Sequence, residues 1–419
     1  MSCRIETRML DAVRFLLIGG ACAALLTGAG SALAQGIRFS VGPDEVLRYP
    51  SNLTDLADEH TTIFPPGAIS NKYVFFASSG VKGATGGAVV LQTSNLKDFA
   101  FADGYATQVM TPAIHFTTCK DDTYDPEFDL NYAAPGSVVQ DPALPPGNLI
   151  MIYEAENHCP GGHWQHDFYA TVGLARSSDN GKTWPAPIDS ELGGDDRYVA
   201  LKNPTSEPTT QENPQVAIGN AIPSAIVAQS TGADGSVEYF LYVVYNTPGP
   251  GNDGMLRIAR AQLGVPGRLQ FAKWYNDDFS QPGIQGLDSA VLPSRGCTGR
   301  QNMGQISYSD ILGLYVMVFV CVDVQQGLAY QAGWWFSTAT DLDLEDWTPP
   351  QPIENSEFPV VNGCANDGTG QSFDGWYPSL MSPGFASGHI SIAGRIFFMS
   401  GCDRGLRQFV SRRFTIAPP

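Results

Sequence analysis

The chain has little positive charge: 24 Lys and Arg residues stand against 42 Asp and Glu residues, which gives a formal net charge of −18 at pH 7. Nucleic acids and anionic membrane surfaces attract proteins through clustered Lys and Arg, so the acidic balance argues against both as partners. Such a balance is ordinary for an exported protein that meets neutral or cationic material.

Beyond residue 34 the chain also lacks an uninterrupted apolar run of about 18 residues, the length that a membrane-spanning helix needs. Its early apolar run, at residues 15–26, follows three arginines and precedes the small-residue sequence Ala-Leu-Ala at 32–34. This order is typical of a signal peptide. We therefore expect a signal peptide over residues 1–34, a single domain over 35–419, and a secreted or periplasmic location.

Long amphipathic helical periods are scarce, whereas Gly (45), Pro (30) and β-branched and aromatic residues are plentiful. Such a composition predicts short strands joined by many turns. A unit of three apolar strands and a Ser- and Asp-rich turn recurs five times, starting near residues 61, 136, 222, 303 and 376. We expect an all-β fold, a five-bladed β-propeller of four-stranded antiparallel sheets.

The fifth unit lacks a fourth strand. We predict that residues 37–41 supply it and close the ring, because an open ring would leave two unpaired strand edges. Three long inserts, at 106–133, 187–221 and 351–375, each precede an inner strand. They are therefore expected to enlarge one rim of the central funnel, where such folds keep their binding sites.

Cysteine is scarce as well, with eight residues, two of which lie in the predicted signal peptide. Six cysteines in an exported chain predict disulfides, with 15 possible connectivities. One cysteine of each proposed pair lies before an inner strand, and the other lies at the end of the following second strand. These positions are neighbours on one rim, so we predict the pairs Cys119–Cys159, Cys297–Cys321 and Cys364–Cys402.

Candidate catalytic residues occupy the second strand of the second unit, where Glu154, Glu156 and His158 alternate and so share one face. Adjacent carboxyl groups beneath a funnel could form an acid and base pair, with the pKa of one raised by the charge of the other. The alternative is a polar interface between blades, satisfied by Arg or by backbone donors.

Further acids precede the inner strands, at Asp55, Asp58, Asp125, Asp129, Glu207, Glu212 and Asp374. Glycoside cleavage needs two carboxyl groups across the scissile bond, about 5–5.5 Å apart for retention and about 6.5–9.5 Å for inversion. A funnel ringed by acids from different blades can supply either spacing. The expected acid is Glu154, Glu156 or Glu212, and the expected base or nucleophile is Asp129 or Asp374.

Two sequence motifs resemble those of sialidases. Residues 177–184, Ser-Ser-Asp-Asn-Gly-Lys-Thr-Trp, match the Asp-box of sialidase-type propellers at every fixed position; this motif stabilises a hairpin and indicates fold rather than chemistry. Residues 47–50, Leu-Arg-Tyr-Pro, resemble the start of sialidases, where the Arg binds the substrate carboxylate. The resemblance implies further arginines at the rim, where Arg300 and Arg404 are candidates.

Residues 212–216, Glu-Asn-Pro-Gln-Val, resemble the E-G-P-x-[IV] stretch of five-bladed furanosidases of the arabinanase and β-xylosidase type, in which the Glu is the general acid. Residues 134–138, Ala-Pro-Gly-Ser-Val, are similar to the A-P-D-V stretch of that family. Asn213 replaces the family's Gly, and Gly136 with Ser137 stands where the family has an acid. The resemblance implies a glycoside hydrolase with Glu212 as its acid.

The loop that holds His158, His163, His166 and Asp167 admits two interpretations, a zinc site or a rim loop that binds substrate or protein, and we favour the second. Trp376 and Tyr377 either stack on a sugar or belong to the core. We expect no metal and no cofactor, and a structural Ca²⁺ is not derivable from the sequence.

The function that we predict is a secreted glycoside hydrolase acting on an extracellular poly- or oligosaccharide through paired carboxylates at the funnel. The alternative is a non-catalytic propeller that binds carbohydrate or protein at the same rim. The partner expected in either case is carbohydrate, the protein is expected to be a monomer, and the substrate-binding residues are expected to be His158, Arg300, Trp376 and Arg404.

Overall fold

The structure, a computed structural model, describes residues 36–54, 56–81, 86–112, 128–158, 168–187, 192–203, 217–232, 234–247, 254–292, 296–297, 299–325, 328–343, 346–357, 375–401 and 408–418. In these residues every helix or strand assigned is a β-strand. Across the same ranges, no helix is long and apolar enough to cross a membrane.

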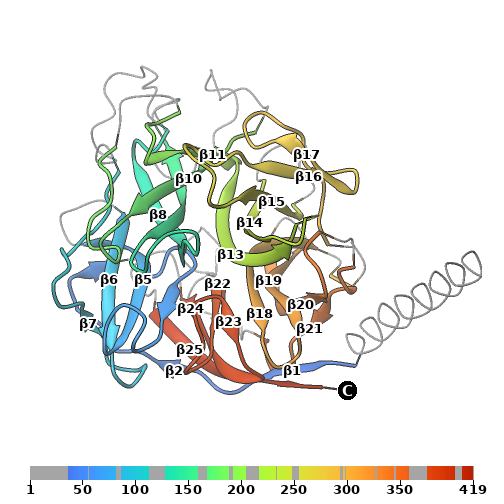
Figure 1. The fold of residues 1–419 in the computed structure, drawn as a ribbon. Helices are drawn as coiled ribbons and strands as arrows, with labels where there is room; N and C mark the ends of the chain where they lie inside the picture. The colour runs from blue at the N-terminus through green and yellow to red at the C-terminus, as the bar shows by residue number, and fades with distance from the viewer. Residues whose placement is uncertain are drawn as a thin grey trace, which may run out of the picture.

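Five antiparallel sheets surround one axis, so the predicted five-bladed β-propeller is confirmed (Figure 1). Each sheet has four main strands, named below in order from the axis outward, and one short additional strand. Blade one contains β4 (Thr62–Phe64), β5 (Tyr73–Val81), β6 (Gly87–Thr93) and β7 (Ala100–Phe101), with β3 (Leu53–Thr54) paired to β5. Blade two contains β8 (Tyr132–Gln140), β9 (Leu149–Asn157), β10 (Phe168–Ser177) and β11 (Arg197–Leu201), with β12 (Ala217–Gly219) paired to β10.

Blade three contains β13 (Ala221–Thr231), β14 (Val237–Asn246), β15 (Leu256–Gln262) and β16 (Ala272–Tyr275), followed by β17 (Asp278–Pro282). Blade four contains β18 (Arg300–Ser309), β19 (Leu314–Gln325), β20 (Leu328–Ala339) and β21 (Gln351–Pro352), with β23 (His389–Ile390) paired to β18. Blade five contains β22 (Trp376–Met381), β24 (Ala393–Ser400), β25 (Gln408–Ala417) and β1 (Arg38–Val41), with β2 (Glu45–Val46) paired to β25.

The insert expected at 187–221 is not a loop throughout, because it contains the strands β11 and β12. Strand β11 is the outer strand of blade two and pairs antiparallel with β10. The sequence pattern ends that unit at the turn after β10. The fourth strand lies further along the chain, where Arg197–Leu201 is buried throughout.

The N-terminal strand closes the ring as predicted. Strand β1 pairs antiparallel with β25, from Arg38 opposite Ala417 to Val41 opposite Phe414, and the two lie side by side in Figure 1. Glu45 then forms ion pairs with Arg395 of blade five (3.2 Å) and with Lys97 in the turn after β6 of blade one (2.9 Å). The hydrogen bond from Lys97 contributes most to lowering the pKa of Glu45, to about 2. Residues 38–45 therefore fasten the last blade to the first.

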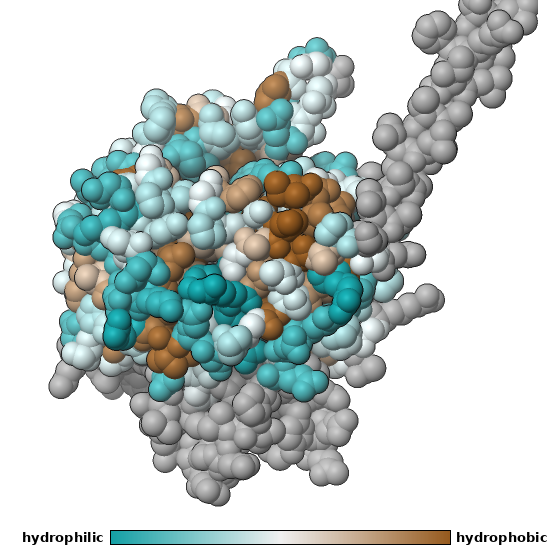
Figure 2. All heavy atoms as spheres, turned by 90° about the horizontal axis from the view of Figure 1, so that it is seen from below, coloured by the Kyte–Doolittle hydropathy of each residue, from teal (hydrophilic) through white to brown (hydrophobic). Residues whose placement is uncertain are grey.

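The hydrophobic core consists of five clusters of buried side chains, and each cluster fills the space between two neighbouring blades. Between blades five and one, for example, the rings of Phe397 and Phe75 meet edge to face with centroids 5.2 Å apart. Both faces of the inner and middle strands are buried, since sheets stack on both sides of each blade. Seen from below, the surface carries apolar patches among hydrophilic side chains (Figure 2).

A ring of hydrogen bonds links the five inner strands around the axis. In each blade a polar side chain accepts a backbone N–H from the next blade: Val138 N to Thr62 Oγ1 (2.8 Å), Ala225 N to Ser137 Oγ (2.9 Å), Ile306 N to Ser224 Oγ (3.3 Å), Leu380 N to Gln305 Oε1 (3.4 Å) and Thr61 N to Ser379 Oγ (2.8 Å). Four of these inner strands, β8, β13, β18 and β22, have a β-bulge just before the residue whose side chain accepts the hydrogen bond. The bulges free backbone amides, and the ring satisfies them across the blade boundaries.

The turn at residues 177–184 is held by its own side chains. Asp179 Oδ1 accepts the backbone N–H groups of Lys182 and Thr183, both at 3.0 Å, and Gly181 has a φ of 78°. The indole of Trp184 donates to the carbonyl of Gly181 (3.0 Å) and lies edge to face with Phe76 of blade one. This turn therefore contributes to the contact between blades one and two.

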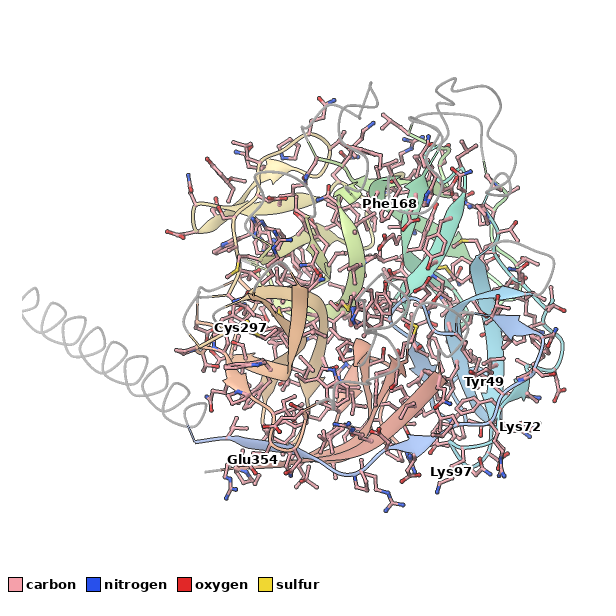
Figure 3. All side chains as sticks on the ribbon, turned by 180° about the vertical axis from the view of Figure 1, so that it is seen from behind. Tyr49, Lys72, Lys97, Phe168, Cys297 and Glu354 are labelled. Atoms are coloured by element: carbon pink, nitrogen blue, oxygen red, sulfur yellow. A yellow bond between two sulfur atoms is a disulfide. The ribbon has the colours of Figure 1, made fainter. Side chains whose placement is uncertain are left out.

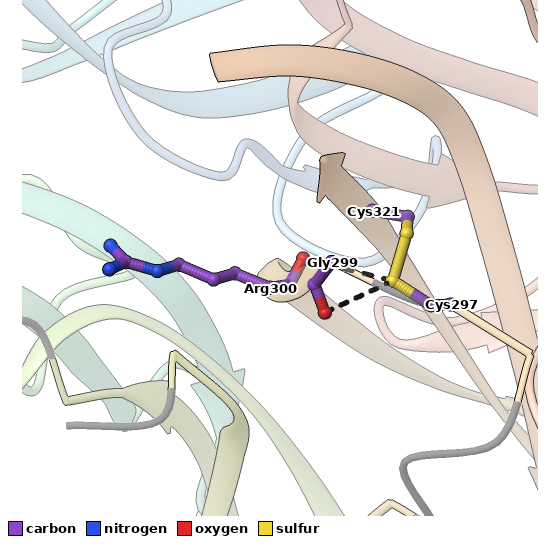
Figure 4. The surroundings of a disulfide bond; sticks show 4 residues. All are labelled: Cys297, Gly299, Arg300 and Cys321. Atoms are coloured by element: carbon purple, nitrogen blue, oxygen red, sulfur yellow. Dashed lines mark hydrogen bonds between the residues drawn. A yellow bond between two sulfur atoms is a disulfide. The ribbon is translucent and has the colours of Figure 1, made fainter. Parts of the chain in front are cut away.

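One predicted disulfide is confirmed. Cys297, before β18, is bonded to Cys321 in β19, with their Cα atoms 5.8 Å apart (Figure 4). The other predicted cysteines lie outside the described residues: Cys119, Cys159, Cys364 and Cys402.

Candidate active site

Strand β9 brings two glutamates into the interior. Every residue of Leu149–Asn157 is buried, and the alternation of the strand places Glu154 and Glu156 on one face and Tyr153 on the other. Glu154 is 3% exposed and Glu156 is 8% exposed. The predicted pair of carboxyl groups on one face of this strand is present.

A third glutamate joins them from blade one. Glu59, in the segment that enters β4, is 2% exposed and is hydrogen-bonded to Glu154, which is in turn hydrogen-bonded to Glu156. Glu154 Oε2 also accepts the backbone N–H of Ile222, at the bulge of β13 in blade three. We call Glu59, Glu154 and Glu156 the acid row; three blades meet at it.

His158 extends the acid row at its outer end. Its Nε2 lies 2.5 Å from Glu156 Oε2, and its backbone N–H donates to Asn131 Oδ1 (2.7 Å). The imidazole lies against the ring of Phe168, with centroids 5.0 Å apart. Phe168 is near the top of Figure 3, far from Lys97 and Glu354 at the bottom, so it lies on the opposite side of the molecule from the N-terminal closure.

Burial raises the pKa of all three carboxyl groups of the acid row. For Glu59 the charge of Glu154 adds to the effect, and for Glu154 the charge of Glu156 does so. Burial brings the pKa of Glu156 to about 8, with a hydrogen bond to Glu154 opposing the rise and the charge of Asp58 adding to it. Two carboxyl groups can hydrogen-bond to each other only when they share a proton, so the acid row retains protons at neutral pH.

Asp129 lies on the opposite face of β9. Its carboxylate is fully buried, accepts the hydroxyl of Tyr153 (2.8 Å) and forms an ion pair with Arg197 (2.6 Å). The same guanidinium also donates to the carbonyls of Pro185 (3.0 Å) and Thr111 (2.9 Å). The structure therefore places this predicted base in a neutralised ion pair and not in the acid row.

Two of the predicted binding residues open the inner strands of blades four and five, and the ring of Tyr377, which Trp376 touches, meets that of His60 with centroids 6.1 Å apart. Arg300 is exposed at the start of β18, and its side chain extends away from the Cys297–Cys321 disulfide (Figure 4). Trp376 opens β22, meets Tyr377 edge to face (5.8 Å) and packs against the core between blades four and five. The remaining candidates lie outside the described residues: Glu212, Asp374 and Arg404, the loop residues His163, His166 and Asp167, and the further acids Asp55, Asp125 and Glu207.

Glu59, His60 and Tyr132 belong to this region although no sequence pattern singled them out. The Tyr132 hydroxyl donates to the backbone carbonyl of Asp58 (2.9 Å), and burial, with the nearby charges of Asp58 and Glu59, raises its pKa well above the usual value. The signal in the sequence is the run Asp58-Glu59-His60 directly before an inner strand, of which only Asp58 is among the predicted acids. Among the described residues no group of three or more His, Cys, Asp or Glu side chains is arranged to hold a metal ion.

No family model and no curated protein matches this chain. Among solved structures it is similar to the catalytic domain of a GH62 alpha-L-arabinofuranosidase from Coprinopsis cinerea (13% identity, covering 91% of this chain and 98% of that chain, TM-score 0.47). It is also similar to an N-acetylgalactosamine deacetylase from F. plautii solved with blood group B trisaccharide (10% identity, 91% and 94% covered, TM-score 0.47). Because identities are this low, these likenesses concern only the fold, and the function depends on the residues of the chain's own site.

Proposed function

We propose that the protein is a secreted glycoside hydrolase that cleaves an extracellular poly- or oligosaccharide, with Glu156 as its general acid. The observation that carries the proposal is the acid row, in which three buried carboxyl groups bond to one another. Their other partners among the described residues are His158 and the backbone N–H of Ile222. Of the Arg and Lys residues that the structure describes, none is paired with these carboxyl groups. Burying acids in this way costs stability, and strongly perturbed carboxyl groups of this kind are typical of functional sites.

Glu156 is the member of the row best suited to donate a proton. Its side chain is 10% exposed, and the whole residue is more exposed than Glu59 or Glu154. With a pKa of about 8 it is mostly protonated at neutral pH, which a general acid requires. It can therefore protonate the glycosidic oxygen as the bond to the sugar breaks.

Asp58 is our candidate for the second carboxyl group. It is half-buried beside the row, and its charge raises the pKa of Glu156 and of Glu59. In an inverting reaction it would take a proton from the attacking water while Glu156 gives its proton to the leaving group; in a retaining reaction it would attack the sugar carbon directly. Asp129 is less suitable, because its charge is already neutralised by Arg197.

A second candidate function is carbohydrate binding without catalysis. It is favoured by the hydrogen bonds within the acid row, which engage the carboxyl groups of Glu154 and Glu156 with each other; that pair is too close for the separation of roughly 5–9.5 Å that glycoside cleavage requires. Under this hypothesis the acid row donates hydrogen bonds to sugar hydroxyls and transfers no proton.

The test uses residues 35–419 with their disulfides intact and a panel of plant, bacterial and host glycans, assayed for bound ligand and for released reducing ends. Release by the wild type that is lost in Glu156→Gln, with binding and melting temperature retained, supports the hydrolase. The matched control is Glu238→Gln, since Glu238 is a glutamate hydrogen-bonded to Gln262 on the exposed surface of blade three. Binding without release would support the second function, and neither binding nor release would contradict both.

A further inference from the structure

A small cavity of about 20 Å³ lies on the propeller axis, separate from the acid row. The inner strands of all five blades line it, through residues that include Thr62, Ser137, Ala225, Gln305 and Leu380. His60 and Thr61, which follow Glu59 in the chain, also line it.

Two residues that line this cavity each have a buried polar atom with no hydrogen-bond partner among the described residues: His60 with Nε2 and Thr61 with Oγ1. His60 is 1% exposed and Thr61 is 7% exposed. Buried polar groups in proteins are almost always hydrogen-bonded, because leaving them unpaired forfeits their hydration without replacement. Two such atoms on one cavity point to a bound hydrogen-bonding molecule.

The hydrogen bonds of His60 define what that molecule must offer. Nδ1 lies 2.9 Å from the carbonyl oxygen of Pro378, and a carbonyl only accepts, so Nδ1 carries the proton. Burial lowers the pKa of His60 to about 4, so the ring is neutral at ordinary pH and Nε2 presents a lone pair. The bound molecule must donate to Nε2, and it can donate to or accept from the Thr61 hydroxyl.

The size of the cavity limits the occupant to one small molecule. A site needs about 10–15 Å³ and two to four polar partners to hold a water molecule, and this cavity meets both conditions. We propose that one ordered water molecule occupies the axial cavity, donating to His60 Nε2 and hydrogen-bonding to Thr61 Oγ1.

This water site would hold in place the segment of blade one that carries Glu59, the member of the acid row that comes from that blade. The backbone N–H of Thr61 already belongs to the ring of axial hydrogen bonds, through Ser379, and the carbonyl of Pro378 holds the His60 ring. A water on the free atoms of the same two residues ties blade one to the axis immediately after Glu59. The water site does not depend on catalysis by the acid row.

The first test is NMR of wild-type protein labelled selectively with ¹⁵N and ¹³C at histidine. We expect the His60 ring to remain the neutral Nδ1–H tautomer between pH 5 and 8, with Nε2 at the shift of a hydrogen-bonded acceptor and a cross-peak to a long-lived water. Absence of that cross-peak would overturn the proposal. A stoichiometric metal in the purified protein, with a His60 spectrum that changes when a chelator removes it, would overturn it too.

The second test compares Thr61→Val with Thr171→Val. The hydroxyl of Thr171 is likewise buried and without a partner among the described residues, but Thr171 does not line the cavity. Removing an unpaired buried hydroxyl is neutral or stabilising, whereas removing one that bonds a water destabilises. We expect Thr61→Val to lower the ratio of folded to unfolded protein about fivefold and Thr171→Val to leave it unchanged or raise it. Equal effects of the two substitutions would argue against the water.

Discussion

The two faces of β9 carry buried acids in contrasting surroundings. On one face Asp129 is held by Arg197 and Tyr153, so its charge has a cation and a hydroxyl to balance it. On the other face the partners of Glu154 are two further carboxyl groups and a backbone amide. Burial is nearly the same on both faces, and the difference lies in the chemistry of the partners. An acid that is buried and neutralised indicates a structural role, whereas buried acids that share protons indicate a site.

The largest effect is expected from a substitution at Glu156, on the face of β9 where the carboxyl groups share protons. Replacing Glu156 by Gln keeps its shape and hydrogen-bonding capacity but removes the transferable proton, so turnover should fall by roughly 10²–10⁴-fold. Stability should stay constant or rise, because folding at neutral pH must place a proton on Glu156, whereas the amide is neutral in both states. Initial rates and thermal unfolding of the same samples measure both quantities. If activity falls only in proportion to the amount of folded protein, the role of Glu156 is structural and not catalytic.

On the other face of β9, a substitution at Asp129 should lower the stability of the protein. Asp129→Asn leaves the Arg197 guanidinium buried without its counter-charge, and breaking such a buried pair costs about 3–5 kcal/mol. Urea unfolding monitored by fluorescence measures the change. The double variant Asp129→Asn with Arg197→Met is expected to recover part of the loss, since neither charge remains. If Asp129→Asn alone has the same free energy of unfolding as the wild type, the two faces of β9 do not differ in the way that we infer.

The pH dependence of stability separates the faces further. Glu156 has a pKa of about 8 in the folded protein against 4.5 as its ordinary value, so the folded state binds the proton more tightly. Its contribution is therefore full below about pH 4.5 and is lost as the pH rises through 8, a decrease of about 3 kcal/mol between pH 5 and pH 8. Melting temperatures at these two pH values should differ less in Glu156→Gln than in the wild type. A wild type and variant with parallel profiles would show that Glu156 does not titrate in this range.

The smallest effect is expected from Tyr153→Phe, which removes the hydrogen bond to Asp129 and the one that the hydroxyl accepts from Arg197 (3.2 Å) but leaves the ion pair between those two residues. The cost should be about 1–2 kcal/mol in the free energy of unfolding, with turnover unchanged. Since Tyr153 directly precedes Glu154 in the chain, a change in catalytic rate here would mean that the two faces are coupled.

Much of the fold could be predicted from the sequence because its signals are local. Alternating strands and recurring turns located all five blades, an unpaired sheet edge identified residues 37–41 as the closing strand, and Cys297 was paired correctly with Cys321. The axial ring also has a signal in the sequence, beyond the strand pattern that located the blades. A Pro or Gly followed by Ser or Gln recurs in four inner strands, at 136–137, 223–224, 304–305 and 378–379.

The site was only partly predictable, because its chemistry depends on contacts between distant segments. Strand alternation was enough to place Glu154 and Glu156 together. It could not show that Glu59 of blade one meets them, or that Asp129 is neutralised by Arg197, 68 residues further along the chain. An acid before an inner strand has the same sequence pattern whether it faces an arginine or another acid.

Closure by β1 also has a consequence for the order of assembly. Arg38 pairs with Ala417, so residues near the start of the chain must wait for residues near its end before the last sheet is complete. The four remaining sheets can form and stack in sequence while blade five still lacks its outer edge. The final step pairs residues 38–41 with residues 414–417, and until then the propeller is an open arc.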